Sequence, residues 1–312
     1  MEKCMQCSDF SLKQHEDTAG SAPSWDRMLI FTLASPWASK IENSLYFPEK
    51  LRMLMKNKVN IEGLRIQCIF PDDDYAQNGI SKVLFYQKSI NNGYVNDYNK
   101  TEFDIPISEL NVMIPEIING KFNTKVLSQS KHTRDLFVCT HGNRDACCGT
   151  QGFVIYEKLK KMFRDNSNVR IWRISHLGGH RFAPNLLDMP QGRIWARFDE
   201  EEVLSIIQSK MDSEIVNKCY RGLISLDSAF EQVLEQKLFS YYGSEWIDRT
   251  LKSYIVSEID TRSALVNLEV KDNNLFSAKV SVKGYVPTLK CMSEDLSDEF
   301  SPQYTIDWKL DS

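Results

Sequence analysis

The spacing of hydrophobic positions predicts short strands that alternate with helices in the first half of the chain. Apolar runs predict strands over 27–33, 64–70 and 82–87, and helices are predicted over 48–56 and 107–118. Pro48 fits the first helical position, and Ser108 is a suitable cap for the second helix, which Pro115 would interrupt. The stretch 91–100 is rich in Asn and Gly and predicts a loop. The alternation is typical of an α/β unit.

The second half of the chain has a clearer pattern. Strands are predicted over 135–138, 169–175, 182–187 and 193–198, and helices over 148–163 and 199–211. The turn at 189–192 should join its two flanking strands as a hairpin. The resulting order, β-α-β-β-β-α, is close to the thioredoxin pattern. After residue 219 we expect one helix over 226–241 and a hairpin of 265–270 with 276–282, turning at 272–274.

These elements divide the chain into four parts: an irregular segment 1–25, an α/β domain 26–130, a thioredoxin-like domain 131–218, and a C-terminal extension 219–312. The polar residues 121–132 are expected to link the two halves. No internal repeat is visible in the sequence. The fold class is therefore predicted as α/β.

Composition and charge exclude several classes of function. The 312 residues carry 38 Lys and Arg against 42 Asp and Glu, so no basic field exists that would attract nucleic acid or an anionic membrane. No run of about 18 apolar residues occurs, so membrane insertion is not expected. The first residues form no apolar or basic leader. We therefore expect a cytoplasmic protein whose thiols are kept reduced.

Residues that can bind a metal are concentrated in two short segments. Cys139 and Cys148 bracket the first, a loop that contains Gly, and His176 and His180 bracket the second, which contains two further glycines. Each segment starts where a predicted strand ends, so both can lie at one edge of one sheet. A glycine-rich loop can wrap closely around a bulky group.

Two thiolates and two imidazoles suit two kinds of centre. One is a tetrahedral Cys₂His₂ zinc site, which would make the protein a structural or interaction module without redox function. The other is a [2Fe–2S] cluster with two cysteines on one iron and two histidines on the other. The residue types alone do not decide between them.

The sequence segments around these residues resemble those of the sucrase/ferredoxin-like family. The matching segments are 139–142, 147–149 and 175–184, together with 18–23 and 220–222, so that the resemblance covers most of residues 15–225. It implies a thioredoxin-like ferredoxin domain with a [2Fe–2S] cluster, held by Cys139 and Cys148 on one iron and by His176 and His180 on the other. No carboxylate pair supports a glycoside hydrolase.

The resemblance implies an electron-transfer or redox-sensing protein rather than an enzyme. Neutral imidazoles in place of two thiolates should raise the reduction potential, and their outer nitrogens should couple reduction to protonation. A redox partner protein is implied but not identified. The sequence leaves the oligomeric state open, although related thioredoxin-like ferredoxins form homodimers.

Other reactive residues receive plainer interpretations. Cys147 is the rival of Cys148 as a ligand, but the family spacing favours Cys148. His141 is interpreted as a solvated loop histidine, and the Cys4–Cys7 pair as part of a frayed terminus. A thiol reductase that uses Cys147 or Cys148 is a third alternative, which the missing Cys-x-x-Cys before the helix disfavours. Arg144, Arg173 and Arg181 flank the ligand segments, where they could tune the potential, dock an acidic partner or form ordinary surface pairs.

Overall fold

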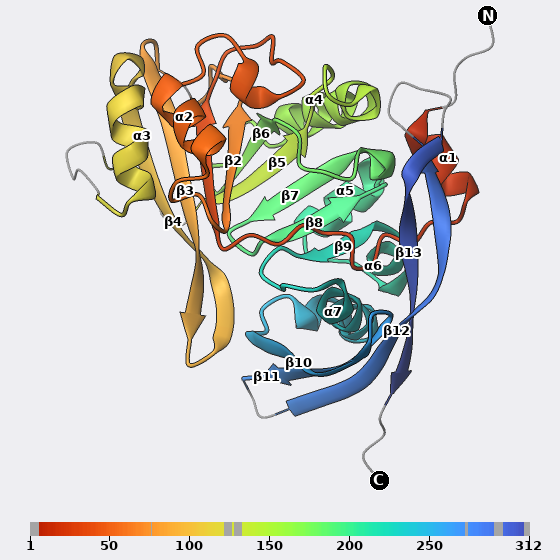
Figure 1. The fold of residues 1–312 in the computed structure, drawn as a ribbon. Helices are drawn as coiled ribbons and strands as arrows, with labels where there is room; N and C mark the ends of the chain where they lie inside the picture. The colour runs from red at the N-terminus through yellow and green to blue at the C-terminus, as the bar shows by residue number, and fades with distance from the viewer. Residues whose placement is uncertain are drawn as a thin grey trace, which may run out of the picture.

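The computed structural model describes residues 6–75, 77–121, 127, 133–271, 274–289 and 296–308. Within them, thirteen strands form one sheet in the order β13-β12-β11-β10-β4-β3-β1-β2-β6-β5-β7-β8-β9 (Figure 1). Most neighbouring strands are antiparallel, and seven α-helices pack around the sheet. The expected mixed α/β class is therefore confirmed. Most of the linker 121–132 lies outside the described residues, as do Cys4 and Cys291.

The N-terminal unit has the element order β-α-β-β-β-α. Its elements are β1 (Arg27–Thr32), α2 (Glu49–Asn57), β2 (Leu64–Ile69), β3 (Ile80–Asn91), β4 (Tyr94–Pro106) and α3 (Leu110–Ile118). Pro48 is the N-cap of α2 rather than its first helical residue, Ser108 lies in a 3-10 turn before α3, and Pro115 lies inside α3 without ending it. Helices α2 and α3 cover an apolar core with β1–β4.

The predicted loop at 91–100 is wrong, because these residues belong to the hairpin of β3 and β4. Asn92 and Gly93 both have positive φ angles, 53° and 83°, which is the geometry of a two-residue type I′ turn. Polar residues dominate this hairpin because its outer end projects away from the core (Figure 1). The hydrophobic pattern that normally reveals a strand is therefore missing.

The second unit repeats the same element order. It contains β5 (Arg134–Cys139), α4 (Phe153–Met162), β6 (Val169–Ile174), β7 (Asn185–Met189), β8 (Arg193–Ala196) and α5 (Glu200–Ile207). A π-helical turn, Cys148–Gly152, precedes α4. The expected hairpin at 189–192 is present as β7 and β8. Asp199 caps α5 with a capping box, and the first turn of the helix is acidic. The helix therefore begins at the position that the sequence predicted.

The two units are joined edge to edge. The strand order is β4-β3-β1-β2 in the first unit and, read in the opposite direction along the sheet, β8-β7-β5-β6 in the second, so both units have the same connectivity. The units meet where Ile69 of β2 pairs with Ile174 of β6. One buried cluster includes residues from β1, β2 and β3 as well as from β5, β6 and β7. The chain therefore contains a structural repeat that its sequence does not show.

A buried ionic network also connects the units. Arg170 of β6 donates to Asp135 of β5 at 2.7 Å and to Glu102 of β4 at 2.8 Å. Lys100 and the Tyr86 hydroxyl donate to the same Asp135 carboxylate. Because isolated charges are costly to bury, each side chain depends on partners from the other unit.

The C-terminal part adds strands at both edges of the sheet, one beside β8 and four beyond β4. It consists of α6 (Ser213–Cys219), β9 (Tyr220–Leu223), α7 (Ala229–Tyr242), β10 (Leu251–Asp260), β11 (Ser263–Val270), β12 (Asn274–Leu289) and β13 (Leu296–Trp308). The expected hairpin is present as β11 and β12, although Asp272 and Asn273 of its turn lie outside the described residues. In Figure 1, α7 lies against these strands.

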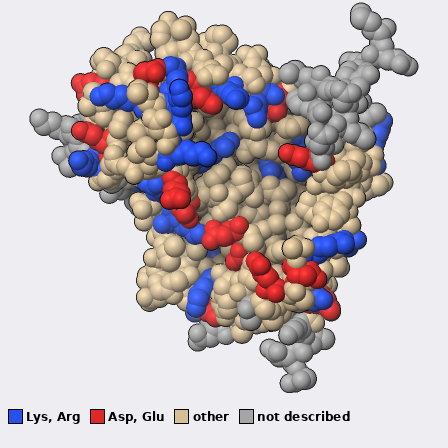
Figure 2. Space-filling view, in the orientation of Figure 1, with Lys and Arg blue, Asp and Glu red and all other residues tan. Residues whose placement is uncertain are grey.

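The sequence predicted that residues 1–25 are irregular, but part of this segment forms a helix. Helix α1 (Cys7–Lys13) packs beside the segment His180–Phe182 and near β12 (Figure 1). No helix among the described residues is long and apolar enough to cross a membrane. Basic and acidic side chains are intermixed on the face shown in Figure 2.

Candidate metal centre

The two ligand segments meet at one edge of the sheet. Cys139 is the last residue of β5, and its register partner on the parallel neighbour β6 is Ile174, two residues before His176. Because parallel strands end at the same edge, the Cys and His segments leave the sheet side by side. This is the placement that the sequence predicted for them.

Cys139 and Cys148 form a pair of buried thiols. A hydrogen bond from the Cys148 thiol lowers the pKa of Cys139, and backbone N–H groups of His141 and Leu177 donate to the same sulfur. The same interaction, together with burial, raises the pKa of Cys148. Of the two thiols, Cys139 is therefore the one that loses its proton more readily. Leu177 follows His176 in the chain, so its hydrogen bond to the Cys139 sulfur connects the segment with the histidines to the segment with the cysteines.

Two glycines allow the Cys loop to pack this tightly. A Cβ atom on Gly152 would lie 2.1 Å from the carbonyl oxygen of Cys139, and a Cβ on Gly149 would lie 2.5 Å from the Cα atom of Gly142. Both contacts are with backbone, which cannot move aside cheaply. The glycines therefore let the helical start that carries Cys148 approach the end of β5.

The imidazole of His176 is oriented by Asp145. Its Nδ1 atom is hydrogen-bonded to a carboxylate oxygen of Asp145, whose side chain is only 2% exposed. Histidines that bind metals commonly donate one ring N–H to a carboxylate in this way, which fixes the ring and leaves the other nitrogen to bind. Here that other nitrogen is Nε2.

His180 is oriented by a cysteine from the N-terminal helix. Its Nδ1 atom lies 3.0 Å from the sulfur of Cys7, and burial lowers its pKa. The Cys7 sulfur lies 3.2 Å from that of Cys147. A hydrogen bond with Cys7 lowers the pKa of the Cys147 thiol to about 6. Cys147 therefore faces α1, whereas its neighbour Cys148 faces Cys139.

A family model matches residues 18–222 and is described as sucrase/ferredoxin-like. The chain belongs to the sucrase/ferredoxin-like family. Similar curated proteins include "Altered inheritance of mitochondria protein 32" of Debaryomyces hansenii, 31% identical over 28% of this chain and 34% of that protein. The protein of the same name from Candida glabrata is 33% identical over 29% of this chain and 33% of its own length.

"Actin patches distal protein 1" of Saccharomyces cerevisiae is 26% identical over 33% of this chain and 38% of that protein. The matched regions thus span about a third of the length of these relatives. No solved structure matches the chain significantly.

The family match ends just after a residue that the sequence did not identify as part of the site, Arg221. Its guanidinium is fully buried and donates to the carbonyl oxygen of Gly178 at 3.0 Å and to Asn185 at 2.9 Å. It also donates to Ser21, near the start of the match. Burial lowers its pKa to about 9, while the Cys148 and Cys139 sulfurs act in the opposite direction. The segment 220–222, which was noted only as resembling the family, was the signal that could have found it.

Arg221 holds the His segment in shape. Gly179 has a φ angle of 69°, and a Cβ there would lie 2.5 Å from the guanidinium. Only a glycine in this left-handed conformation lets the arginine pass beneath the chain between His176 and His180. The guanidinium also interacts electrostatically with the sulfurs of Cys148 and Cys139.

The interpretation of His141 as a solvated residue is wrong. It is 2% exposed, its Nε2 atom bonds the carbonyl oxygen of Ala38 at 2.9 Å, and its Nδ1 accepts the backbone N–H of His176 at 3.3 Å. Burial lowers its pKa. His141 is therefore a neutral structural residue that connects the N-terminal unit to the His segment.

The flanking arginines have different roles. Arg181 pairs with the buried Glu16 at 2.6 Å, and Arg173 lies over the ring of Phe70. Arg144 is exposed. Only Arg144 therefore remains a candidate for docking an acidic partner.

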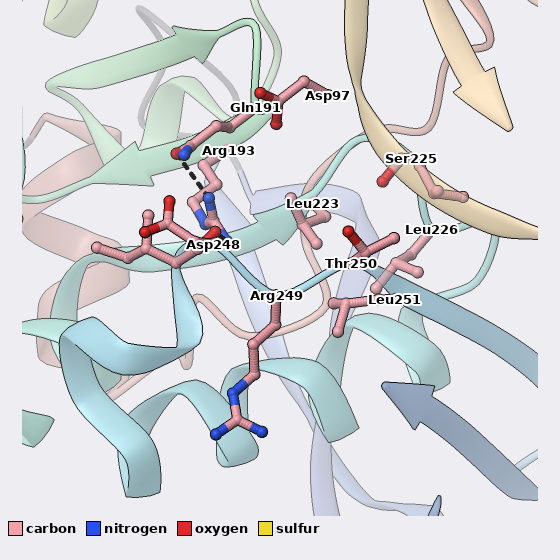
Figure 3. A pocket seen from close by; sticks show the side chains of 12 residues that line it. Asp97, Gln191, Arg193, Leu223, Ser225, Leu226, Asp248, Arg249, Thr250 and Leu251 are labelled. Carbon is pink, nitrogen blue, oxygen red and sulfur yellow. Dashed lines mark hydrogen bonds between the residues drawn. The ribbon is translucent and has the colours of Figure 1, made fainter. Parts of the chain in front are cut away.

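Among the described residues, no three His, Cys, Asp or Glu side chains are arranged to hold one metal ion. A cavity of about 260 Å³ lies elsewhere, between the turn of β7 and β8, β9 and the start of β10 (Figure 3). Arg193 donates a hydrogen bond to Gln191, and both residues line this cavity. None of the four predicted ligands, Cys139, Cys148, His176 and His180, lines it. A second cavity, of about 270 Å³, is lined by Arg65, Arg144 and His176.

Proposed function

We propose that this protein binds a [2Fe–2S] cluster and acts in electron transfer or redox sensing. Cys139 and Cys148 would hold one iron, and His176 and His180 the other. The observation that carries the proposal is that the two ligand segments leave the sheet side by side after β5 and β6, one with two thiols in contact and the other with two oriented imidazoles. Two protein ligands per iron is the requirement of a binuclear cluster.

The choice of Cys148 over Cys147 is supported by the directions of the two side chains. The Cys148 thiol contacts Cys139, whereas Cys147 contacts Cys7. The buried Arg221 adds electrostatic support, because a cation without hydration favours a negative group beside it. Thiolates at Cys139 and Cys148, and a cluster that gains an electron, would provide that negative charge.

We further propose that the unit from β5 to α5 is a thioredoxin-like ferredoxin domain. Its support is the strand order β6-β5-β7-β8, with β5 and β6 parallel and the other neighbours antiparallel. The N-terminal unit has the same connectivity without the Cys and His pairs. Its role would be to cover the shared core and to fix His141 through Ala38.

When bound, the cluster would supply one-electron redox chemistry. The protein residues would manage the accompanying proton. Asp145 is the hydrogen-bond partner of Nδ1 of His176, and the sulfur of Cys7 is the partner of Nδ1 of His180. Protonation at these nitrogens would compensate added negative charge, so the reduction potential should fall as pH rises.

The electron donor and acceptor would be other proteins, reached at the exposed Arg144 near His176. The names of the relatives refer to inheritance of mitochondria and to actin patches. They indicate no redox reaction, and the cytoplasmic location expected from the sequence stays a prediction.

The test is anaerobic purification of the full chain, followed by metal and sulfide analysis and by absorption and EPR spectra before and after dithionite. We expect about two iron and two sulfide per chain and a reduced signal of low average g. A colourless protein with one zinc per chain would instead support the structural Cys₂His₂ module and end the cluster proposal.

Histidine ligation is tested by substitution. His176→Cys with His180→Cys should keep a cluster, lower its potential and remove most of its pH dependence. His15→Cys is the matched control, because His15 is exposed and lies outside the site. A pH dependence that survives the double substitution would show that these histidines are not the ligands.

A further inference from the structure

We propose that Cys7 and Cys147 form a reversible disulfide that fastens helix α1 beside the candidate metal centre. The two residues are 140 positions apart in the sequence, yet their sulfurs are separated by only 3.2 Å. This dithiol is distinct from the Cys139–Cys148 pair. It does not depend on the presence of a cluster.

The position of Cys7 is set by contacts that do not involve sulfur. Gln151 donates to Ser8 at 3.1 Å and to Gln6 at 3.2 Å, which holds the start of α1 on the turn that follows Cys147. At the other end of the helix, Arg197 donates to Ser11 and to the carbonyl oxygen of Glu16, each at 2.6 Å. The docked helix therefore presents Cys7 to Cys147 without help from a covalent bond.

Both sulfurs are covered when α1 is docked, since Cys7 is 3% and Cys147 2% exposed. Helix α1 has only seven residues, and short terminal helices open locally at low free-energy cost. Opening would expose both thiols to a small-molecule disulfide such as glutathione disulfide. Redocking would then bring the second thiol to the first.

The reaction balances as two thiol–disulfide exchanges. The Cys147 sulfur attacks glutathione disulfide, forming a mixed disulfide and releasing one glutathione, which leaves with the proton that Cys147 loses. The Cys7 sulfur then attacks the Cys147 sulfur and releases the second glutathione with the proton of Cys7. The protein loses two electrons and two protons, and one glutathione disulfide becomes two glutathione molecules.

The bond would change the surroundings of His180. In the dithiol state, Cys7 is within hydrogen-bonding distance of both Cys147 and Nδ1 of His180. A disulfide has no S–H, and its sulfur is a weaker hydrogen-bond partner for that nitrogen than a thiol. Oxidation would thus fix α1 in place and weaken the contact with one imidazole, which makes the pair a redox-sensitive element of this site.

The experiment treats the full chain, as purified, with a series of glutathione redox buffers, followed by acid quenching, alkylation with N-ethylmaleimide and trypsin. We expect two fewer alkylated cysteines, a mass lower by about 2 Da before alkylation, and a linked pair of peptides 4–13 and 145–158 whose fragments join Cys7 to Cys147. Dithiothreitol should reverse all three changes. Fragments that join Cys147 to Cys139 instead of Cys7 would overturn the proposal.

Variants separate this pair from its neighbours. Cys7→Ser and Cys147→Ser should each abolish the linked peptides, whereas Cys4→Ser, which changes the same peptide 4–13, should leave them. Loss of the link in Cys4→Ser, or no link in the wild-type chain at any glutathione ratio, would overturn the proposal. Because the wild-type peptide map decides by itself, a variant that fails to fold does not remove the test.

Discussion

Asp145 offers the sharpest test of how the protein would hold a metal centre, through Asp145→Asn. The substitution keeps the size of the side chain but removes the charge that bonds Nδ1 of His176. A hydrogen bond to a charged group contributes about 1.5–3 kcal/mol. At 1.4 kcal/mol per factor of ten, this predicts a loss of about 10- to 100-fold in cofactor affinity. Measured effects of such outer partners of metal ligands span the same range, about 10–100-fold.

The assay is competition with an iron chelator, with the iron retained by the protein measured at equilibrium. The midpoint for Asp145→Asn should move to a chelator concentration about 10- to 100-fold lower than for the wild type. Asp212→Asn is the control, because Asp212 is an exposed N-cap of α6 and Asn caps helices equally well. The reasoning is refuted if Asp145→Asn stays within about twofold of the wild type, or if the control shifts as much.

Two further predictions concern the stability of the surrounding fold. Burial raises the pKa of Glu235 to about 7 from 4.5, so the folded state keeps a proton that the unfolded chain loses, and stability should fall as pH rises from 4.5 to 7. The shift corresponds to about 3 kcal/mol. In urea unfolding, Glu235→Gln should therefore match the wild type near pH 4.5 and exceed it by up to about 3 kcal/mol at pH 8; an equal difference at both pH values would contradict this origin. Gly152→Ala should destabilise the fold by about 1–3 kcal/mol, because its Cβ would collide with the carbonyl oxygen of Cys139. Gly284→Ala, which meets no atom within 4 Å, should change the free energy of unfolding by less than about 0.5 kcal/mol, and similar losses in both variants would argue against tight packing at the Cys loop.

Elements with a strong local pattern were predictable from the sequence. The strands around residues 135–138 and 169–175 are largely buried and have several apolar residues each, and the helix after Asp199 has its cap and acidic first turn in the sequence. The hairpin of β3 and β4 was missed because most residues of its outer end are polar, so the alternating hydrophobic pattern of a strand is missing there. Helix α1 was missed because seven residues do not form a stable helix without tertiary contacts.

The residues of the candidate site also differ in whether the local sequence could reveal them. Cys139, Cys148, His176 and His180 could be selected because their residue types and spacing are unusual, and because strand ends place them at one edge. Their partners were not selected. Asp145 and Cys7 are ordinary in local sequence, and Arg221 was marked only by the family segment 220–222. Cys7 and Arg221 also come from segments far along the chain from their contacts.

By itself, the amino-acid sequence determined the apolar and polar periodicity, the strand ends that carry the Cys and His residues, and the motifs shared with the family. Those properties are local, since each depends on residues within one turn or one strand. The tertiary structure alone decided that two units share one core, that His141 is buried and neutral, and that α1 brings a second pair of thiols to the site. These features depend on contacts between residues more than 100 positions apart, such as Cys7 with Cys147 and His141 with Ala38, for which a local pattern carries no signal.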